Sequence, residues 1–104
     1  MSSWYTVAKT SEIAEGQGRQ VRVPGRRKPF ALFRYEGQFF VVDDGCPHAY
    51  ASLSEGRVKD FLVSCPAHGA NFDIRSGRGQ GPYEHLDLRT LPVRVAGEEV
   101  QVEF

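Results

Sequence analysis

Two short motifs hold both cysteines and two of the three histidines of this 104-residue chain. Cys46 and His48 form a C-x-H motif, and Cys65 and His68 form a C-x-x-H motif, with sixteen residues between the two. Thiolate sulfur and imidazole nitrogen are the donors of a mixed-ligand iron–sulfur centre. The same four donors also suit a tetrahedral structural zinc site. The spacing therefore predicts a metal centre but leaves the identity of the metal open.

The residues around these ligands bear on the choice between an iron–sulfur cluster and zinc. The run CPHAYASLSEG begins at Cys46, the run CPAHGANFD begins at Cys65, and both are followed by Gly77, a Gly81-Pro82 pair and a closing LPVRV run at 91–95. Over about residues 40 to 104 this combination resembles the Rieske family. The resemblance implies one [2Fe-2S] cluster per chain. It also implies that Cys46 and Cys65 bind one iron, and that His48 and His68 bind the other through Nδ1.

The chain departs from the respiratory branch of that family at the positions of a second cysteine pair. The branch has a disulfide beside the cluster, whereas this chain has Ala51 and Ala67 at the matching positions. With both cysteines committed to metal, we expect the cluster itself and the apolar residues beneath it to hold the two ligand loops. Metal binding should then be part of folding.

A second departure bears on the redox potential. The high-potential branch places a serine and a tyrosine hydroxyl near the cluster sulfurs, and this chain has Ala70 and Phe72 there. Hydrogen bonds to the sulfurs favour the reduced cluster. Their loss should move the potential toward the bottom of the Rieske range, which runs from about −150 to about +300 mV. Such a centre suits reduction by a flavoprotein and does not suit quinol oxidation.

Length and composition predict a single globular domain. A chain of 104 residues is near the size at which one core suffices. Thirteen basic and thirteen acidic residues balance, which argues against nucleic acid as a generic partner. No apolar run approaches the roughly 20 residues of a membrane span, and the first residues, MSSWY, lack the features of a signal peptide. We expect a cytoplasmic protein, where two free thiolates are stable.

The local patterns predict short strands and turns. Pro29–Tyr35 and Gln38–Asp43 flank Glu36-Gly37 as a hairpin, and a second hairpin turns at Ala96-Gly97-Glu98. The remaining strands are expected at Val21–Val23, Val58–Ser64, Ala70–Ile74, Leu91–Val95 and Glu99–Phe104, with one short helical turn at Ser11–Glu15.

Together these elements predict an all-β Rieske iron–sulfur fold. We expect an antiparallel β-sandwich base from about residues 1–42 and 82–104, with a small cluster-binding subdomain from about 43–81 inserted into it. The expected core residues are mostly β-branched or aromatic: Phe30, Leu32, Phe33, Phe39, Val41, Leu62, Phe72, Leu91, Val93, Val95 and Val100.

Three further features lie outside the four proposed ligands. Tyr50 either shields the cluster, faces a partner or is an ordinary half-exposed loop residue. The only basic run, Arg26-Arg27-Lys28, follows a Pro-Gly turn and is expected in the base, remote from the cluster. His85 belongs to no ligand motif and is expected on the surface.

The resemblance implies a soluble Rieske ferredoxin that is an electron carrier and not an enzyme. Its expected partners are an NAD(P)H-dependent flavin reductase and the terminal oxygenase of an aromatic-ring dioxygenase or related system, as in aromatic hydrocarbon catabolism. A monomer is expected, with an uncharged docking tip at residues 47, 49, 50, 66, 67, 69, 82 and 83. The alternatives are a small Rieske subunit of an NAD(P)H nitrite reductase-type oxidoreductase and a zinc-stabilised structural module.

Overall fold

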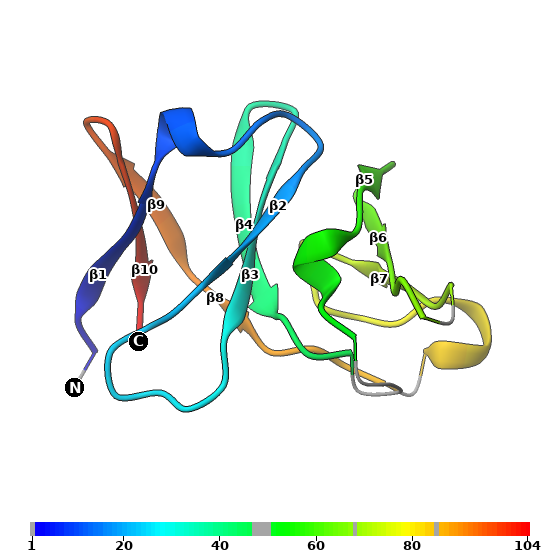
Figure 1. The fold of residues 1–104 in the computed structure, drawn as a ribbon. Helices are drawn as coiled ribbons and strands as arrows, with labels where there is room; N and C mark the ends of the chain where they lie inside the picture. The colour runs from blue at the N-terminus through cyan, green and yellow to red at the C-terminus, as the bar shows by residue number, and fades with distance from the viewer. Residues whose placement is uncertain (1, 47–50, 68, 85) are drawn as a thin grey trace.

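The computed structural model describes residues 2–46, 51–67, 69–84 and 86–104 as three antiparallel sheets (Figure 1). The first sheet contains β1 (Trp4–Lys9), β10 (Glu99–Glu103) and β9 (Val93–Ala96), in that order. The second contains β2 (Gly18–Val21), β3 (Phe30–Tyr35), β4 (Gln38–Asp43) and β8 (Thr90–Leu91). The third contains β5 (Val58–Lys59), β6 (Leu62–Ser64) and β7 (Asn71–Asp73). Three short 3₁₀ helices accompany them: η1 (Thr10–Glu12), η2 (Leu53–Glu55) and η3 (Gly81–Tyr83).

The strands β3 and β4 form the middle layer of the molecule. Because successive side chains of a strand point to opposite faces, β3 supplies Phe30 and Leu32 to one cluster of buried residues and Ala31 and Phe33 to another. All four of these side chains are buried. A strand covered on both faces needs a continuous apolar run, which is what the sequence provides here.

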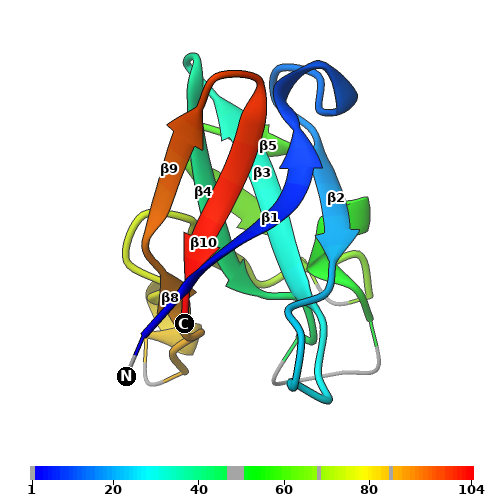
Figure 2. The ribbon, with the colours of Figure 1, turned by 90° about the vertical axis from the view of Figure 1, so that its left-hand side faces the viewer.

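One of the two clusters lies inside the base. Leu32 and Val41 of the middle layer pack there with Ala8, Val100 and Val102 from β1 and β10. Figure 2 shows the sheet of β1, β10 and β9 in front of the sheet that contains β3 and β4. The two sheets of the base therefore pack face to face, as expected for a β-sandwich.

The other cluster lies between the middle layer and the small sheet of β5, β6 and β7. Ala31, Phe33 and Val42 meet residues of the small-sheet half, including Val63 and Phe72. Cys46 and Cys65 belong to this cluster. The half of the molecule that carries both cysteines is thus packed on the base through buried apolar residues.

The structure confirms the all-β prediction and most of the expected strands. The hairpin at Glu36-Gly37 is present: Tyr35 pairs with Gln38, and the two turn residues have positive φ angles of 52° and 73°. Two residues with positive φ are the mark of a type I′ turn, whose twist matches that of the flanking strands. The predicted helical turn at Ser11–Glu15 appears as η1, which begins one residue earlier and already ends at Glu12.

Four expectations about the strands were wrong. The strand expected at Val21–Val23 is β2, which spans Gly18–Val21 and ends before Pro24. The sequence did not reveal β1, which pairs with β10 at the other end of the chain. Val58–Ser64 is not one strand but a hairpin, because Asp60 and Phe61 turn the chain with φ angles of 53° and 63°. Leu91–Val95 is divided between two sheets, since Leu91 belongs to β8 and Val93 begins β9.

The expected core is largely correct. Six of the eleven residues are buried, and Phe39, Leu62, Leu91 and Val93 are partly buried. Val95 is the exception, with 50% of its surface exposed. It lies on β9, the outer strand of its sheet, beside the hairpin turn that contains Gly97. None of the helices in the described ranges is long and apolar enough to cross a membrane.

Candidate metal centre

Cys46 follows the end of β4 after Asp44 and Gly45. Gly45 forms an isolated bridge with Ser52, and the Cys46 N–H donates to the carbonyl oxygen of Ala51 at 3.0 Å. This bond ties Ala51 to Cys46, and the cysteine itself is 6% exposed. Cys46 is therefore fixed by β4 on one side and by the returning chain on the other.

Cys65 occupies a matching position after β6. Its N–H donates to the carbonyl oxygen of Ala70 at 2.7 Å, and its own carbonyl accepts from the Gly69 N–H at 2.8 Å. Gly69 has a φ of 71°, which a residue without a β-carbon adopts most readily. Cys65 is 1% exposed, whereas its neighbours Pro66 and Ala67 are exposed.

The two cysteine loops share one construction. In each, the cysteine N–H bonds to the carbonyl of the residue five positions later, so that Cys46 and Cys65 start loops of equal length. Both cysteines belong to one buried cluster, and no disulfide joins them. Buried thiols presented by two matched loops fit the sulfur half of an iron–sulfur centre, whose ligands are shielded from solvent.

Both histidines of the motifs, His48 and His68, lie outside the described residues, as do Tyr50 and His85. Within the described ranges no three His, Cys, Asp or Glu side chains gather around a metal position. The described part of the structure thus places the two predicted sulfur ligands, and the nitrogen ligands remain a prediction from the sequence.

Asp44 holds the chain that enters Cys46 in place through hydrogen bonds. The sequence did not indicate this role. Its side chain is 1% exposed and accepts hydrogen bonds from the Ser54 N–H at 2.7 Å and from Gln20 Nε2 at 2.8 Å. Its carbonyl accepts from the Leu53 N–H at 2.8 Å. Asp44 therefore joins β2, η2 and the chain entering Cys46. The available signal was an acidic pair, Asp43-Asp44, at the end of an apolar strand.

The chain after β7 folds back against the small sheet at Phe72. Gly79 forms a bridge with Phe72, and its N–H donates to the Leu86 carbonyl at 2.9 Å. A β-carbon at Gly79 would collide with the carbonyl oxygen of Tyr83. A glycine is required here because the two passes of backbone are so close. This segment carries Pro82, which is exposed, and Tyr83, which is half-buried.

Asp73 and Arg75 form an ion pair at the end of β7. Arg75 Nη2 lies 2.8 Å from Asp73 Oδ2, and its Nε lies 3.1 Å from Oδ1. The Arg75 side chain lowers the pKa of Asp73 chiefly through these bonds, although partial burial works against the effect. The guanidinium also lies 4.1 Å from the centre of the Phe61 ring. This arrangement ties β7 to the β5–β6 turn.

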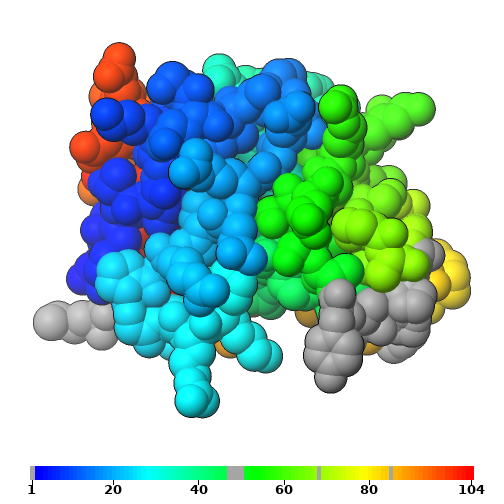
Figure 3. All heavy atoms as spheres, in the orientation of Figure 1, coloured from blue at the N-terminus to red at the C-terminus, as the bar shows by residue number. Residues whose placement is uncertain are grey.

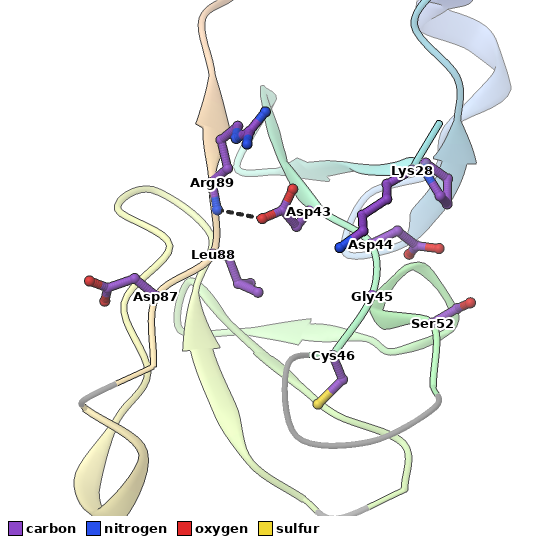
Figure 4. A pocket seen from close by; sticks show the side chains of 10 residues that line it. Lys28, Asp43, Asp44, Gly45, Cys46, Ser52, Asp87, Leu88 and Arg89 are labelled. Carbon is purple, nitrogen blue, oxygen red and sulfur yellow. Dashed lines mark hydrogen bonds between the residues drawn. The ribbon is translucent and has the colours of Figure 1, made fainter. Parts of the chain in front are cut away.

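The structure corrects the expected position of the basic run. Lys28 and Cys46 line the same hollow, which has a volume of about 360 Å³ (Figure 4). The Asp44 N–H also donates to the Pro29 carbonyl at 3.3 Å, so the end of the basic loop is bonded to the chain entering Cys46. Arg26-Arg27-Lys28 belongs to the base, as predicted, but Lys28 at its end is not remote from the Cys46 loop. Lys28 and Cys46 are far apart in the sequence, so the sequence did not indicate that they line one hollow.

These features define a small all-β protein whose two cysteines sit in paired loops at one end. Residues 3–92 match the family model described as "Rieske [2Fe-2S] domain". The chain belongs to that family.

The comparisons with individual proteins agree. The chain is 34% identical over 102 residues to the anthranilate 1,2-dioxygenase ferredoxin subunit of Burkholderia cepacia, covering 98% of this chain and 93% of that protein. It matches a chain of the complex of reduced oxygenase and oxidized ferredoxin in carbazole 1,9a-dioxygenase, with a TM-score of 0.85 and 33% identity over 95% of this chain and 91% of that one. A putative NADH-dependent nitrite reductase small subunit from Mycobacterium tuberculosis has a TM-score of 0.90 at 23% identity, covering 100% of this chain and 96% of that one. This last likeness is one of fold alone.

Proposed function

We propose that this chain is the ferredoxin component of an aromatic-ring dioxygenase or related oxygenase system. It would carry single electrons from an NAD(P)H-dependent flavin reductase to the terminal oxygenase, and it would catalyse no reaction of its own. The observation that carries the proposal is the pair of buried cysteines in matched loops of a Rieske chain that resembles dioxygenase ferredoxins along nearly its whole length. We infer that the protein acts in the reducing cytoplasm as a monomer.

The proposed ligand set is Cys46 and Cys65 on one iron and His48 and His68 on the other. The bound [2Fe-2S] cluster would supply a site that gains and loses one electron. The described residues contribute in two ways. Burial of Cys46 and Cys65 keeps water from the thiolate ligands, and the hydrogen bonds of both loops fix the positions of the cysteines before an electron arrives.

The decisive experiment is low-temperature EPR of anaerobically purified protein after dithionite reduction, with iron, acid-labile sulfide and spins counted per chain. A rhombic signal with an average g below that of an all-cysteine cluster, at about one spin per chain, would support the proposal. A colourless, EPR-silent protein that contains zinc under conditions that permit cluster assembly would support the structural-module alternative instead.

Variants test the ligand assignment. His48→Cys and His68→Cys should each shift the average g toward that of an all-cysteine cluster or abolish the cluster, because imidazole nitrogen is replaced by thiolate. His85→Ala is the matched control and should leave the signal unchanged. An unchanged spectrum in both ligand variants would contradict the assignment.

The midpoint potential provides an independent prediction. Ala70 and Phe72 are fully buried and carry no hydroxyl group that could donate to a cluster sulfur. We therefore expect a midpoint near the low end of the Rieske range, at about −150 mV. Protein-film voltammetry at pH 7 measures it directly. A midpoint well above zero would contradict the expectation and favour a high-potential centre.

A further inference from the structure

A basic surface lies beside the Cys46 loop. Residues 22–29, here called the basic loop, connect β2 to β3 and project from the lower end of the base in Figure 3. Arg22, Arg26, Arg27 and Lys28 are all exposed in this loop. Arg89, which precedes β8, lines a hollow of about 370 Å³ together with Arg26, Arg27 and Lys28. Four cations therefore surround one shallow depression.

The basic loop is held in shape by its own contacts. The Arg26 N–H donates to the Val23 carbonyl at 3.1 Å across the turn at Gly25, whose φ is 81°. Arg22 Nη1 donates to the Arg27 carbonyl at 3.1 Å. The Arg26 guanidinium stacks 3.4 Å from the centre of the Phe104 ring. A loop ordered in this way loses little conformational freedom when a partner binds.

None of these contacts pairs a cation of the basic loop with a carboxylate in the described part of the chain. In the ranges that the structure describes, the ion pairs are Arg19 with Glu12 and Arg75 with Asp73, and neither involves the basic loop or Arg89. Asp43 is the one carboxylate that lines the hollow with the four cations. Asp43 Oδ2 accepts a hydrogen bond from the Arg89 N–H at 2.7 Å, so it is partly satisfied by the backbone.

The basic loop also lies next to the proposed electron-transfer site. Lys28 shares a second hollow with Cys46 (Figure 4), where Asp43, Asp44 and Asp87 are the carboxylates. Asp44 is buried and bonded to Ser54 and Gln20, which leaves Asp87 as the exposed carboxylate of this hollow. A partner seated on the basic loop would therefore lie beside the loop that presents Cys46.

We propose that the basic loop, with Arg89, docks a carboxylate-rich protein surface of the redox partner. This inference rests on the proposed function, because a carrier must bring its partner close to the ligand loops. Complementary charge accelerates such encounters without a large interface. The balanced total charge of the chain favours a local protein contact over general binding of nucleic acid.

The test compares two doubly charge-reversed forms of the reconstituted holoprotein. Arg27→Glu with Lys28→Glu reverses two of the four charges of the basic loop and so cancels its net positive charge. Arg57→Glu with Lys59→Glu changes the net charge equally at the β5 end, where both residues are exposed and form no ion pair within the described ranges. Figure 1 shows β5 at the end opposite the basic loop. Stopped-flow spectroscopy follows electron transfer from the dithionite-reduced protein to cytochrome b5, an acidic haem protein that serves as the probe, at increasing ionic strength.

We expect wild-type electron transfer to slow as salt is added, and the Arg27/Lys28 variant to be about tenfold slower at low salt with a weakened salt dependence. The Arg57/Lys59 variant should stay within about twofold of wild type, since its charges lie at the opposite end of the molecule from the docking surface. Equal loss in both variants, no loss in either, or binding of the wild type to an RNA probe without attraction to cytochrome b5 would overturn the inference. Failure of the proposed function is distinguishable, because a wild-type protein without an EPR-active cluster would reduce no acceptor at all.

Discussion

At the scale of single residues, the Cys46 loop depends on a buried carboxylate that carries no obvious chemistry. Asp44 is 1% exposed, and its two oxygens accept from Ser54 and Gln20. A buried charged group is stable only when hydrogen bonds compensate the loss of water. Asp44 therefore places the chain that enters Cys46 against β2 and η2, and through it positions the proposed ligand Cys46.

Replacing Asp44 by alanine should destabilise the holoprotein by about 3 kcal/mol, because two bonds to a charged acceptor are lost and the partly buried Ser54 N–H loses this acceptor. Asp44→Asn should cost less, since its amide oxygen can still accept from Ser54. Denaturant unfolding followed by the visible absorbance of the cluster measures both. Asp87→Ala, at an exposed site on the same hollow, is the control and should stay within about 0.5 kcal/mol of wild type. A loss no greater for Asp44→Ala than for this control would contradict the proposed role.

At the scale of elements, the sequence predicts what local patterns decide. Glu36-Gly37 is a hairpin turn in sequence and structure because both residues adopt positive φ in it. The pair Asp60-Phe61 makes the same kind of turn with no glycine, so no local signal marked it. Strand β1 was missed for a different reason. Its partner is β10 at the far end of the chain, and pairing over such a distance leaves no local pattern.

At the candidate site, too, local patterns predict some features and contacts between distant segments decide the others. The motifs place Cys46 and Cys65 as ligands from spacing and family resemblance, and the structure adds the shared loop construction. The bracing by Asp44 and the proximity of Lys28 depend on tertiary contacts between segments far apart in sequence. Spacing along the chain cannot reveal such contacts, which is why the basic run was wrongly expected to be remote.

The Asp60-Phe61 turn yields a test of backbone strain. Phe61 packs edge-on against Tyr35 at 4.8 Å and Phe40 at 6.0 Å between ring centres. Phe61→Ala should cost about 2 to 3 kcal/mol, near the low end for a phenylalanine because the ring is only partly buried. Phe61→Gly should be at least as stable as Phe61→Ala, since glycine tolerates the φ of 63°.

Equilibrium unfolding in urea ranks these two variants. Phe39→Ala and Phe39→Gly, at a partly buried position inside β4, are the matched pair. There glycine should be the worse residue by about 0.5 to 1 kcal/mol. If glycine is worse than alanine at position 61 as well, the left-handed turn does not govern the stability of this hairpin.

A second element-scale prediction concerns the β3–β4 hairpin and pH. The Glu15 carboxylate accepts from the N–H groups of Gly37 at 3.1 Å and Glu36 at 2.5 Å. These bonds lower the pKa of Glu15 from its ordinary value of 4.5, with the Gly37 bond as the larger cause. A lowered folded-state pKa means that the stabilisation is present above the unfolded pKa and is lost as the pH falls through the folded value.

Glu15→Gln should therefore lower the Tm at pH 7 and converge with wild type as the pH falls below about 4. Thermal melts of both proteins between pH 3 and 7 test this difference. Glu98→Gln, on an exposed turn, should follow the wild-type curve at every pH. A constant Tm difference between Glu15→Gln and wild type across the range would show that the carboxylate charge is irrelevant to the turn.

At the scale of the whole molecule, the two clusters of buried residues differ in their relation to the metal. The cluster inside the base is built from β1 to β4, β9 and β10 and contains no cysteine. The cluster on the other face of β3 and β4 contains both cysteines. The small sheet beside it has strands of two to three residues, too short to be stable alone. The base should therefore fold without metal, while the ligand-bearing half needs it.

Hydrogen–deuterium exchange on holoprotein and apoprotein tests this division. Removing the [2Fe-2S] cluster takes away the metal bonds that would link the loops of Cys46 and Cys65. Metal binding of this kind is coupled to folding. We expect peptides from β5 to β7 and the two ligand loops to lose most of their protection in the apoprotein. Peptides from β1 and β10 should keep theirs, because the buried residues of these two strands belong to the group that contains no cysteine. Uniform loss would mean that the two halves fold as one unit, and uniform retention would mean that the hydrogen bonds of the loops suffice without metal.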